Sequence, residues 1–415
     1  MLASKSLWIF NQYAITPDMP GGSRHYDLSK ELVKYGYDVT IFASSFHYTR
    51  HEEMKLFRNE RWRIEIVNGI RFVWIKNFGY QRNNWRRIVN ILSYTVGSYL
   101  LARKISKVKH NVPIPDVVIG SSFHLLAVLS AFFVAKYYQS GFIMEVRDLW
   151  PQTLVDLGTL KAQNPIVQLM YAIEKFLYLR AQRIITLLPL ADRYIIARGV
   201  NSDKIVWIPN GVDLCKFPNV KACPTSKADF TVMYLGGHCQ TDGLHVLIDA
   251  AKVISDSKYE QIRFCLVGDG PEKQKLIEQR DELNLNNTNF NDSIPKSEVS
   301  NFISKSDVCL VSSLGIDVYK YGLSFNKLFD YLATSKPIIM IGNPANNIVK
   351  EVKCGFSIPA NDPNALANAI ITLYQMPLEQ RLSMGERGRE YVEKHHDIRT
   401  LADKLSKCIE EVNSG

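Results

Sequence analysis

The sequence predicts an α/β protein with two doubly wound domains in succession. Short β-branched runs alternate with amphipathic helical patterns, a rhythm typical of parallel sheets covered by helices on both faces. The rhythm occurs in two series, and several of the strands end in glycine-rich turns. Ligands of such sheets bind beyond the carboxyl ends of the strands. Two domains of this kind therefore predict a central cleft that suits a substrate with two parts.

The first series predicts a domain over residues 1–213. Ser23 is expected to cap a helix over residues 24–35, which Gly36 would end. The strands of this domain are predicted at residues 7–10, 38–43, 116–120, 142–148, 183–188 and 204–213.

A linker is expected next, over residues 214–229, because this stretch lacks periodicity and holds two prolines. The second domain is predicted over residues 230–390, and residues 391–415 are expected to form a C-terminal helix that packs back toward the first domain. The strands of the second domain are predicted at residues 230–237, 262–270, 307–313 and 336–342, with helices at 243–255 and 326–334.

Composition and charge limit the class of protein. The seven cysteines are scattered without a C-x-x-C pair, which favours a reducing compartment and argues against a zinc site. The most apolar window, residues 125–135, is about half the length of a membrane span. A cytoplasmic protein without a transmembrane helix is expected. The net charge of +9 suits an anionic partner, and nucleic acid is the weakest candidate because no zinc finger or RRM signature is visible.

The first glycine-rich turn lies between a predicted strand and the helix that follows Ser23. Gly21 and Gly22 leave backbone N–H groups bare at a helix start, where the helix dipole favours an anion and Arg24 adds positive charge. The alternative is an ordinary turn between a strand and a helix, and the glycine pair by itself does not separate the two.

The second domain contains two more such turns. One follows a strand with Gly236, Gly237 and His238, and the other contains Gly268, Gly270 and Pro271. In the latter, a glycine-x-glycine-proline sequence after an apolar strand lets a flat ring approach the backbone closely, and proline fits the first turn of a helix. His238 is either a ligand contact or simply a polar loop residue.

The stretch SFNKLFDYLATSKPII, residues 324–339, places hydrogen-bond donors and the positive charge of Lys327 at a helix start. Asp330 stands among apolar residues, so its carboxylate needs a partner or a ligand. It is a candidate to accept hydrogen bonds from the ribose of a sugar nucleotide while the helix start holds the diphosphate. The alternative is that Asp330 only complements the helix dipole, worth about 0.3–1 kcal/mol.

These motifs together resemble the family-4 glycosyltransferases of the GT-B fold, of the bacterial O-antigen and capsule type. The resemblance covers nearly the whole chain. It rests on PGGSRHYDLSKELVKYGYDVTIFA, EVRDLWPQTLVDLG, KIVWIPNGVD, MYLGG, DGLHVLIDAAK, LVGDGP and KLFDYLATSKPII, in this order. EVRDLWP with GGSRHYDL is most similar to amino-sugar and deoxy-amino-sugar transferases such as N-acetylfucosaminyl transferases.

The resemblance implies an anomer-retaining transfer from a nucleoside diphosphate sugar, with UDP favoured, and with no metal or other cofactor. In such enzymes the departing phosphate oxygen is often proposed as the base. The implied donor-binding residues are Gly21, Gly22, Gly236, Gly237, His238, Gly268, Gly270, Pro271, Asn326, Lys327, Leu328 and Asp330. The implied catalytic residues are Arg147, Asp148 and Lys327, and the implied acceptor-side residues are Arg24, His25 and His124.

The chain departs from the family pattern around this site. Many relatives carry glutamates where Gly322 and Asp330 stand, an arginine at Gly237, a lysine at Asp242 and a histidine at Arg147. Lys327, and His238 if it is protonated, would then supply the positive charge near the leaving group.

Residues 82–109 form a basic stretch with an apolar side. This pattern predicts either a helix that lies in an anionic membrane interface or a first-domain core helix with a solvated face. In the first case the protein would be peripheral at the inner face of the cell membrane, near a lipid-diphosphate-linked saccharide acceptor. The apolar residues are Trp85, Ile88, Ile91, Leu92 and Tyr99, and the basic ones are Arg86, Arg87, Arg103, Lys104, Lys107 and Lys109.

Two other functions compete with sugar transfer. One is a UDP-sugar 2-epimerase on the same fold, although its acidic and histidine residues have no clear counterpart here. The other is a non-catalytic, transferase-like subunit that scaffolds a partner, which the missing charges at Gly322 and Asp242 would suit.

Overall fold

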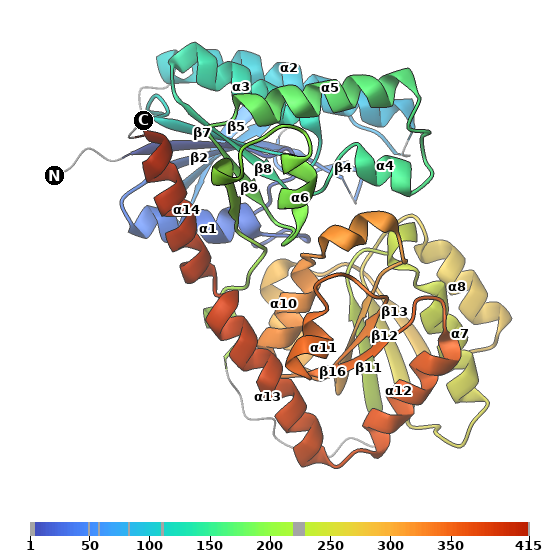
Figure 1. The fold of residues 1–415 in the computed structure, drawn as a ribbon. Helices are drawn as coiled ribbons and strands as arrows, with labels where there is room; N and C mark the ends of the chain where they lie inside the picture. The colour runs from blue at the N-terminus through green and yellow to red at the C-terminus, as the bar shows by residue number, and fades with distance from the viewer. Residues whose placement is uncertain are drawn as a thin grey trace. The chain divides into compact units, whose positions relative to one another are not determined.

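The computed structural model describes residues 5–48, 50–56, 59–81, 84–108, 112–218 and 229–413. The chain forms two compact units (Figure 1). The first unit comprises Met1–Thr16, Gly22–Pro209 and Ile398–Gly415, and the second comprises Pro17–Gly21 and Asn210–Asp397. Arg82, Lys109, Cys223 and residues 219–228 of the expected linker lie outside the described residues.

The first unit is built on an eight-stranded sheet of order β10-β9-β8-β7-β1-β2-β6-β5. All neighbours pair in parallel except β5 and β6, which form an antiparallel hairpin at one edge. Between β2 and β5 in the sequence, β3 (Phe46–His47) and β4 (Glu52–Glu53) form a separate two-stranded pair. The strands are β1 (Ser6–Phe10), β2 (Asp38–Ser44), β5 (Trp62–Val67), β6 (Ile70–Ile75), β7 (Val117–Ser121), β8 (Gly141–Val146), β9 (Arg183–Thr186) and β10 (Ile205–Trp207).

Helices cover both faces of this sheet. Helices α1 and α14 pack together on one face, and α2, α3 and α5 pack side by side on the other (Figure 1). The helices are α1 (Arg24–Lys34), α2 (Trp85–Val108), α3 (Leu125–Tyr138), α4 (Gln152–Asp156), α5 (Pro165–Arg180), α6 (Ala191–Ile196) and α14 (Ile398–Asn413), with a 3₁₀ turn η1 (Ser202–Lys204).

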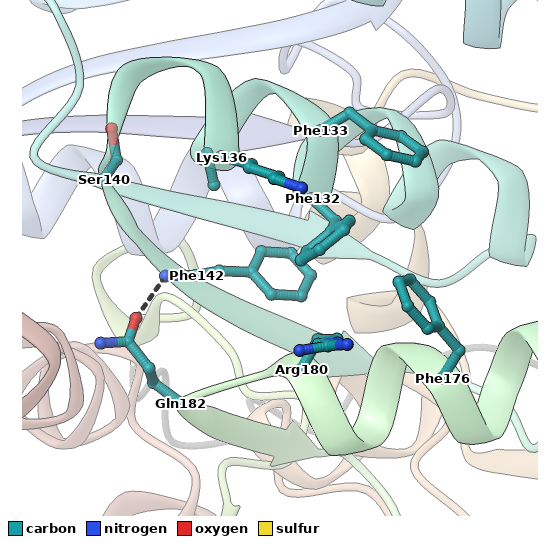
Figure 2. A pocket seen from close by; sticks show the side chains of 9 residues that line it. Phe132, Phe133, Lys136, Ser140, Phe142, Phe176, Arg180 and Gln182 are labelled. Atoms are coloured by element: carbon teal, nitrogen blue, oxygen red, sulfur yellow. Dashed lines mark hydrogen bonds between the residues drawn. The ribbon is translucent and has the colours of Figure 1, made fainter.

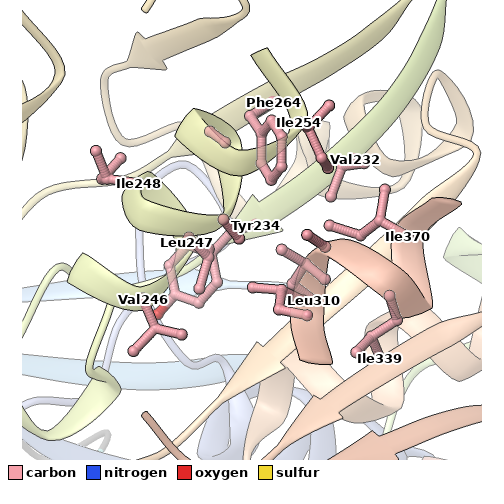
Figure 3. Close-up of a cluster of buried hydrophobic side chains, with 14 of the residues drawn as sticks. Val232, Tyr234, Val246, Leu247, Ile248, Ile254, Phe264, Leu310, Ile339 and Ile370 are labelled. Carbon is pink, nitrogen blue, oxygen red and sulfur yellow. The ribbon is translucent and has the colours of Figure 1, made fainter. Parts of the chain in front are cut away.

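The second unit contains a six-stranded, wholly parallel sheet of order β13-β12-β11-β14-β15-β16. Its main core packs β-strand residues such as Val232 and Phe264 against Leu247 and Ile254 of α7 and Ile370 of α12 (Figure 3). The strands are β11 (Phe230–Leu235), β12 (Ile262–Val267), β13 (Thr288–Asn291), β14 (Val308–Ser312), β15 (Ile338–Ile341) and β16 (Gly355–Ile358).

The helices that flank this sheet are α7 (His245–Ser255), α8 (Lys273–Glu282), α9 (Val299–Ser304), α10 (Asn326–Ala333), α11 (Ile348–Val352), α12 (Pro363–Gln375) and α13 (Leu378–His395). Four 3₁₀ turns accompany them: η2 (Leu214–Lys216), η3 (Gln240–Asp242), η4 (Lys296–Glu298) and η5 (Asp317–Tyr321). None of the helices in the described part of the chain, in either unit, combines the length and hydrophobicity needed to cross a bilayer.

The structure confirms the doubly wound α/β fold and every predicted strand, but several boundaries differ. The last predicted strand of the first unit, 204–213, ends at Trp207. The carbonyl groups of Ile208 and Pro209 turn away from the sheet to accept hydrogen bonds from Arg24. The first unit therefore ends at Pro209, where the sequence suggested 213, and it regains the chain from Ile398.

The predicted cap of α1 is wrong. Ser23 has φ −90° and ψ 15°, close to helical backbone, and its hydroxyl donates to the carboxylate of Asp27 at 2.5 Å. A side chain caps a helix start only when its residue is extended, so that its oxygen reaches back to the N–H groups of the first turn. Ser23 therefore holds the N-cap position, where its carbonyl accepts from the N–H of Asp27, but its side chain does not cap the helix.

A buried carboxylate in α5 makes the stability of the first unit depend on pH. Burial raises the pKa of Glu174 to about 7, although Arg198 binds it at 2.8 Å and the hydroxyl group of Tyr178 donates to it. The pKa is raised above that of the unfolded chain. Glu174 therefore makes its full contribution to the free energy of unfolding, about 3 kcal/mol, below about pH 4.5. This contribution is lost as the pH rises through about 7.

Replacing this residue, Glu174→Gln, is expected to remove that pH dependence. Urea unfolding of the wild type should show stability that falls between pH 5 and pH 8, and the variant should show a smaller fall. Equal falls in both proteins would contradict a raised pKa at this position.

Candidate active site

Two glycine-rich turns lie in backbone contact at the carboxyl ends of β11 and β12. Gly268 has φ +145°, and a Cβ atom added there would lie 1.9 Å from the carbonyl oxygen of Gly236. A Cβ atom on Gly270, which has φ +158°, would lie 2.4 Å from the carbonyl oxygen of His238. Larger residues are excluded at both positions by this contact and by the backbone angles. Glycine at these positions thus lets the two turns form one edge of a site.

Lys327, in the first turn of α10, reaches this edge. Its ammonium group donates to the carboxylate of Asp242 at 2.6 Å and to the hydroxyl oxygen of Tyr234 at 2.6 Å. The Cβ position of Gly236 lies 3.0 Å from Nζ of Lys327. Both side chains of the ion pair are only 13% exposed. The lysine is therefore held close to the glycine-rich turn, and Asp242 balances its charge.

In the sequence, Asp242 stood out only because many relatives carry a lysine at its position. In the structure, its carboxylate is the ion-pair partner of Lys327. The two residues are 85 positions apart in the sequence. A phosphate group that approached Lys327 would therefore exchange one anionic partner for another.

His238 lies buried between two aromatic rings, those of Tyr234 and Phe290, each with its centroid 6.0 Å away. Among the residues that the structure describes, neither ring nitrogen has a hydrogen-bond partner. Burial, with a smaller effect from Lys273, lowers the pKa of His238 to about 4. His238 is therefore neutral at pH 7, and the expectation that it supplies positive charge is wrong. Its ring nitrogens remain a donor and an acceptor to which no described residue binds.

Asp330, in the second half of α10, has a protein partner that sequence reasoning missed. Its carboxylate accepts a hydrogen bond from the ammonium group of Lys296 in η4 at 2.5 Å, and the two side chains are 6% and 11% exposed. The segment Pro17–Gly21 belongs to the same unit, where the carbonyl oxygen of Met19 accepts from the N–H of Lys296. The ion pair thus lies beside part of the first glycine-rich turn.

Near the start of α10, Ser324 was expected to face an anion, but its side chain contacts the backbone. Its hydroxyl oxygen accepts a hydrogen bond from the N–H of Asn210 at 2.9 Å. No side chain caps the helix among the described residues, and Asn326, Lys327 and Leu328 form its first turn. These three positions, which the sequence assigned to a diphosphate, therefore remain candidates for it.

In the first unit, a buried glutamate that the sequence analysis did not single out organises the carboxyl edge of the sheet. Glu145, in β8, accepts from Nε of Arg24 at 2.8 Å, from Nε2 of His25 at 2.8 Å and from the hydroxyl of Ser121 at 2.7 Å. Burial by itself would raise the pKa of Glu145, yet His25 and Arg24, which both donate to it, hold it well below its ordinary value. An acidic residue inside an otherwise apolar run, FIMEV, was the available signal.

This network fixes the roles of Arg24 and His25 in the structure. Arg24 also donates to the carbonyl groups of Ile208 and Pro209, so all its nitrogens are engaged internally and it does not point into an open anion pocket. Nδ1 of His25 accepts from the amide of Asn11 at 2.8 Å, which leaves the proton on Nε2. Burial lowers the pKa of both side chains.

His124 caps α3, since its Nδ1 accepts from the N–H of Ala127 at 3.1 Å. Its Nε2 therefore carries the proton and donates to Gln12 at 2.6 Å, and burial lowers its pKa to about 3. Arg147 and Asp148 follow β8. The guanidinium of Arg147 lies 5.6 Å above the ring of Phe123, and Asp148 is exposed.

The predicted site residues are thus divided between the two units. The second unit brings together Gly236, Gly237, His238, Gly268, Gly270 and Lys327, and it also holds Gly21, Pro271, Asn326, Leu328 and Asp330. The first unit holds Gly22, Arg24, His25, His124, Arg147 and Asp148. Among the described residues, no group of three or more His, Cys, Asp or Glu side chains is arranged to hold a metal ion.

Comparisons with known proteins match both units. Residues 21–216 match the description "Glycosyltransferase Family 4", and residues 229–376 match "Glycosyl transferases group 1". "Probable glycosyltransferase WbjE" of Pseudomonas aeruginosa is 22% identical over 347 residues, which cover 80% of this chain and 83% of that protein. "Putative colanic acid biosynthesis glycosyltransferase WcaL" of Escherichia coli strain K12 is 25% identical over 232 residues, which cover 54% of this chain and 56% of that protein.

A solved structure shows the same fold over the whole chain. Anabaena Alr3699/HepE in complex with UDP and glucose superposes with a TM-score of 0.67 and 15% identity, covering 98% of this chain and 100% of that one. At this identity the likeness concerns the fold.

Proposed function

Because the chain belongs to the group 1 and family 4 glycosyltransferases and has their GT-B fold, we propose that it moves a sugar from UDP to a lipid-linked saccharide. The observation that carries the proposal is Lys327, held at the start of α10 beside the interlocked turns of Gly236 and Gly268. A cation, a helix start and close-packed glycines together suit a diphosphate. The UDP in the complex of Anabaena Alr3699/HepE supports this choice of nucleotide.

In the proposed complex, the first turn of α10 and Lys327 bind the diphosphate, and the turn around Gly268 and Gly270 lies against the base. Asp330 accepts hydrogen bonds from the ribose while it keeps one oxygen on Lys296. His238, neutral and without a partner among the described residues, donates to or accepts from the donor sugar or the phosphates.

The proposed chemistry needs little beyond charge stabilisation. As the bond between the sugar and the diphosphate breaks, negative charge grows on the phosphate oxygens, where preorganised donors have their largest effect. Lys327 balances that charge, so no metal is required in the proposal. The acceptor hydroxyl attacks from the same face with retention of the anomer, and its proton passes to the departing phosphate oxygen. Arg147 and Asp148 are proposed to contact the reacting sugar, an N-acetylated amino or deoxy-amino sugar.

Helix α2 supports a lipid-linked acceptor, because its apolar side faces outward. Its buried residues are mostly small or polar: Asn90, Tyr94, Ser98, Ala102 and Ile105. A row at helical spacing is exposed instead, from 46% at Leu92 to 61% at Trp85, and it comprises Trp85, Ile88, Leu92, Val96 and Leu100. Basic residues of the same helix suit an anionic bilayer. We propose that this side of α2 rests in the membrane interface, as a surface-polysaccharide enzyme with a lipid-linked substrate would require.

The test is an assay that follows both nucleotide and sugar. The protein is incubated with UDP-, GDP- and dTDP-linked N-acetylated amino sugars and a lipid-diphosphate saccharide, and UDP release and glycosylated lipid are measured. Acceptor-dependent UDP release with glycosylated lipid is the expected result, and the anomeric configuration of the product tests retention.

Two other outcomes would contradict transfer. An epimerised donor without acceptor-dependent release would identify a 2-epimerase. Binding of UDP-sugar without any turnover would identify a non-catalytic subunit. The ion pair between Lys327 and Asp242 is compatible with such a subunit. Chelation of divalent cations is expected to leave the rate unchanged.

A further inference from the structure

A groove of about 420 Å³ lies on the first unit between α3 and α5, and none of the residues that line it is assigned to the reaction. Figure 2 shows its aromatic wall, formed by Phe132 from α3, Phe142 from β8 and Phe176 from α5. The ring of Phe132 lies 5.5 Å from that of Phe142 and 5.3 Å from that of Phe176, edge to face in both cases. The rings thus form a continuous apolar surface inside the groove.

Two cations border this apolar surface. In Figure 2, Lys136 and Arg180 lie on opposite sides of the Phe132 and Phe142 rings. The guanidinium of Arg180 lies 5.5 Å from the centre of the Phe176 ring. Both cations are exposed, and neither forms an ion pair with a residue in the described parts of the chain. An anion that reached the groove would therefore meet two charges without competing carboxylates.

The helices around the groove, like the groove itself, combine a lack of exposed acidic residues with exposed apolar side chains. In the sequences of α2, α3 and α5 the only acidic residue is Glu174, which is buried against Arg198. Phe133 of the groove is exposed, and so are further large apolar side chains on the same two helices, Tyr137, Ile166, Leu169 and Leu179. A soluble anion would use the cations but not this apolar surface, and a neutral apolar ligand would use the surface but not the cations. A molecule with an acyl chain and an anionic headgroup uses both.

We propose that this groove binds one anionic phospholipid of the membrane, with its phosphate on Lys136 and Arg180 and the first part of an acyl chain against the phenylalanine rings. The inference rests on the proposed function, in which α2 meets the bilayer, and it extends that contact across α3 to α5. A bound lipid would hold the first unit on the anionic leaflet where a lipid-linked acceptor is found. Binding at the groove does not require turnover, so it is measurable by itself.

The test uses dihexanoylphosphatidylglycerol below its critical micelle concentration, titrated into the full-length protein by calorimetry. One saturable site is expected. Lys136→Gln/Arg180→Gln should weaken binding about tenfold or more, because each basic residue contributes near an anionic headgroup. Phe176→Ser, which removes an apolar wall at a partly exposed position, should weaken it as well while leaving the charges in place.

Lys404→Gln/Lys407→Gln is the matched control, since these exposed lysines lie on α14, across the sheet from the groove. It should bind the lipid as the wild type does. Absence of saturable binding, equal weakening in the control, or equally tight binding of glycerol phosphate or of dihexanoylphosphatidylcholine would overturn the assignment. UDP binding by the same variants should be unchanged. Lipid binding by a protein that shows no sugar transfer would support the groove and contradict the proposed function instead.

Discussion

Replacing Lys327 by methionine is expected to lower kcat for sugar transfer by about 10²–10³-fold. Removal of one preorganised donor to a charge that grows in the transition state has an effect of this size. Lys327 is the cation that the fold holds against the glycine-rich turn, with Nζ 2.6 Å from Asp242 and from the hydroxyl of Tyr234. Methionine keeps much of the apolar stem, but the variant leaves the largely buried carboxylate of Asp242 without its cation, so the melting temperature is expected to fall. The rates are therefore compared at a temperature at which circular dichroism shows both proteins to be folded. Steady-state UDP release measures the effect.

Asp242→Asn is the matched opposite of this variant. It removes the charge that balances Lys327 and leaves an oxygen in the same place, so UDP binding is expected to become tighter. Asp242 is therefore predicted to weaken donor binding in the wild-type protein. If Lys327→Met and Asp242→Asn changed UDP affinity in the same direction, the ion pair would be structural and the diphosphate would bind elsewhere.

Replacing Asp330 by alanine is expected to destabilise the second unit by about 3–5 kcal/mol. The change leaves the ammonium group of Lys296 buried without its partner, and breaking a buried pair from one side has a cost of this order. The two side chains are 6% and 11% exposed, so water compensates little. The midpoint of urea unfolding measures the loss.

The double variant Asp330→Ala/Lys296→Met removes both charges and is expected to recover much of that stability. It also isolates the proposed contact with ribose. The folded double variant should bind UDP more weakly than the Lys296→Met variant does. Equal affinities in these two proteins would contradict a role for Asp330 in ribose binding.

The sequence alone determined the features that depend on neighbouring residues. Strands could be predicted from β-branched runs, several of which end in glycine-rich turns, and Gly268 and Gly270 have backbone φ angles of +145° and +158° that favour glycine. The helical spacing of Trp85, Ile88 and Leu92 likewise predicted an apolar side of α2. The resemblance to family-4 glycosyltransferases followed from the order of such local motifs, and the comparisons agree with it.

Only the tertiary structure decided which charges meet. Asp330 pairs with Lys296 across 34 positions, Lys327 with Asp242 across 85, and Glu145 with Arg24 across 121. Pairs so distant in sequence have no local signal, because parallel crossovers bring their strands and helices together. The same holds for the direction in which α2 turns its apolar side. Periodicity predicts a stripe, but whether the stripe faces the core or the exterior depends on what packs against the other side.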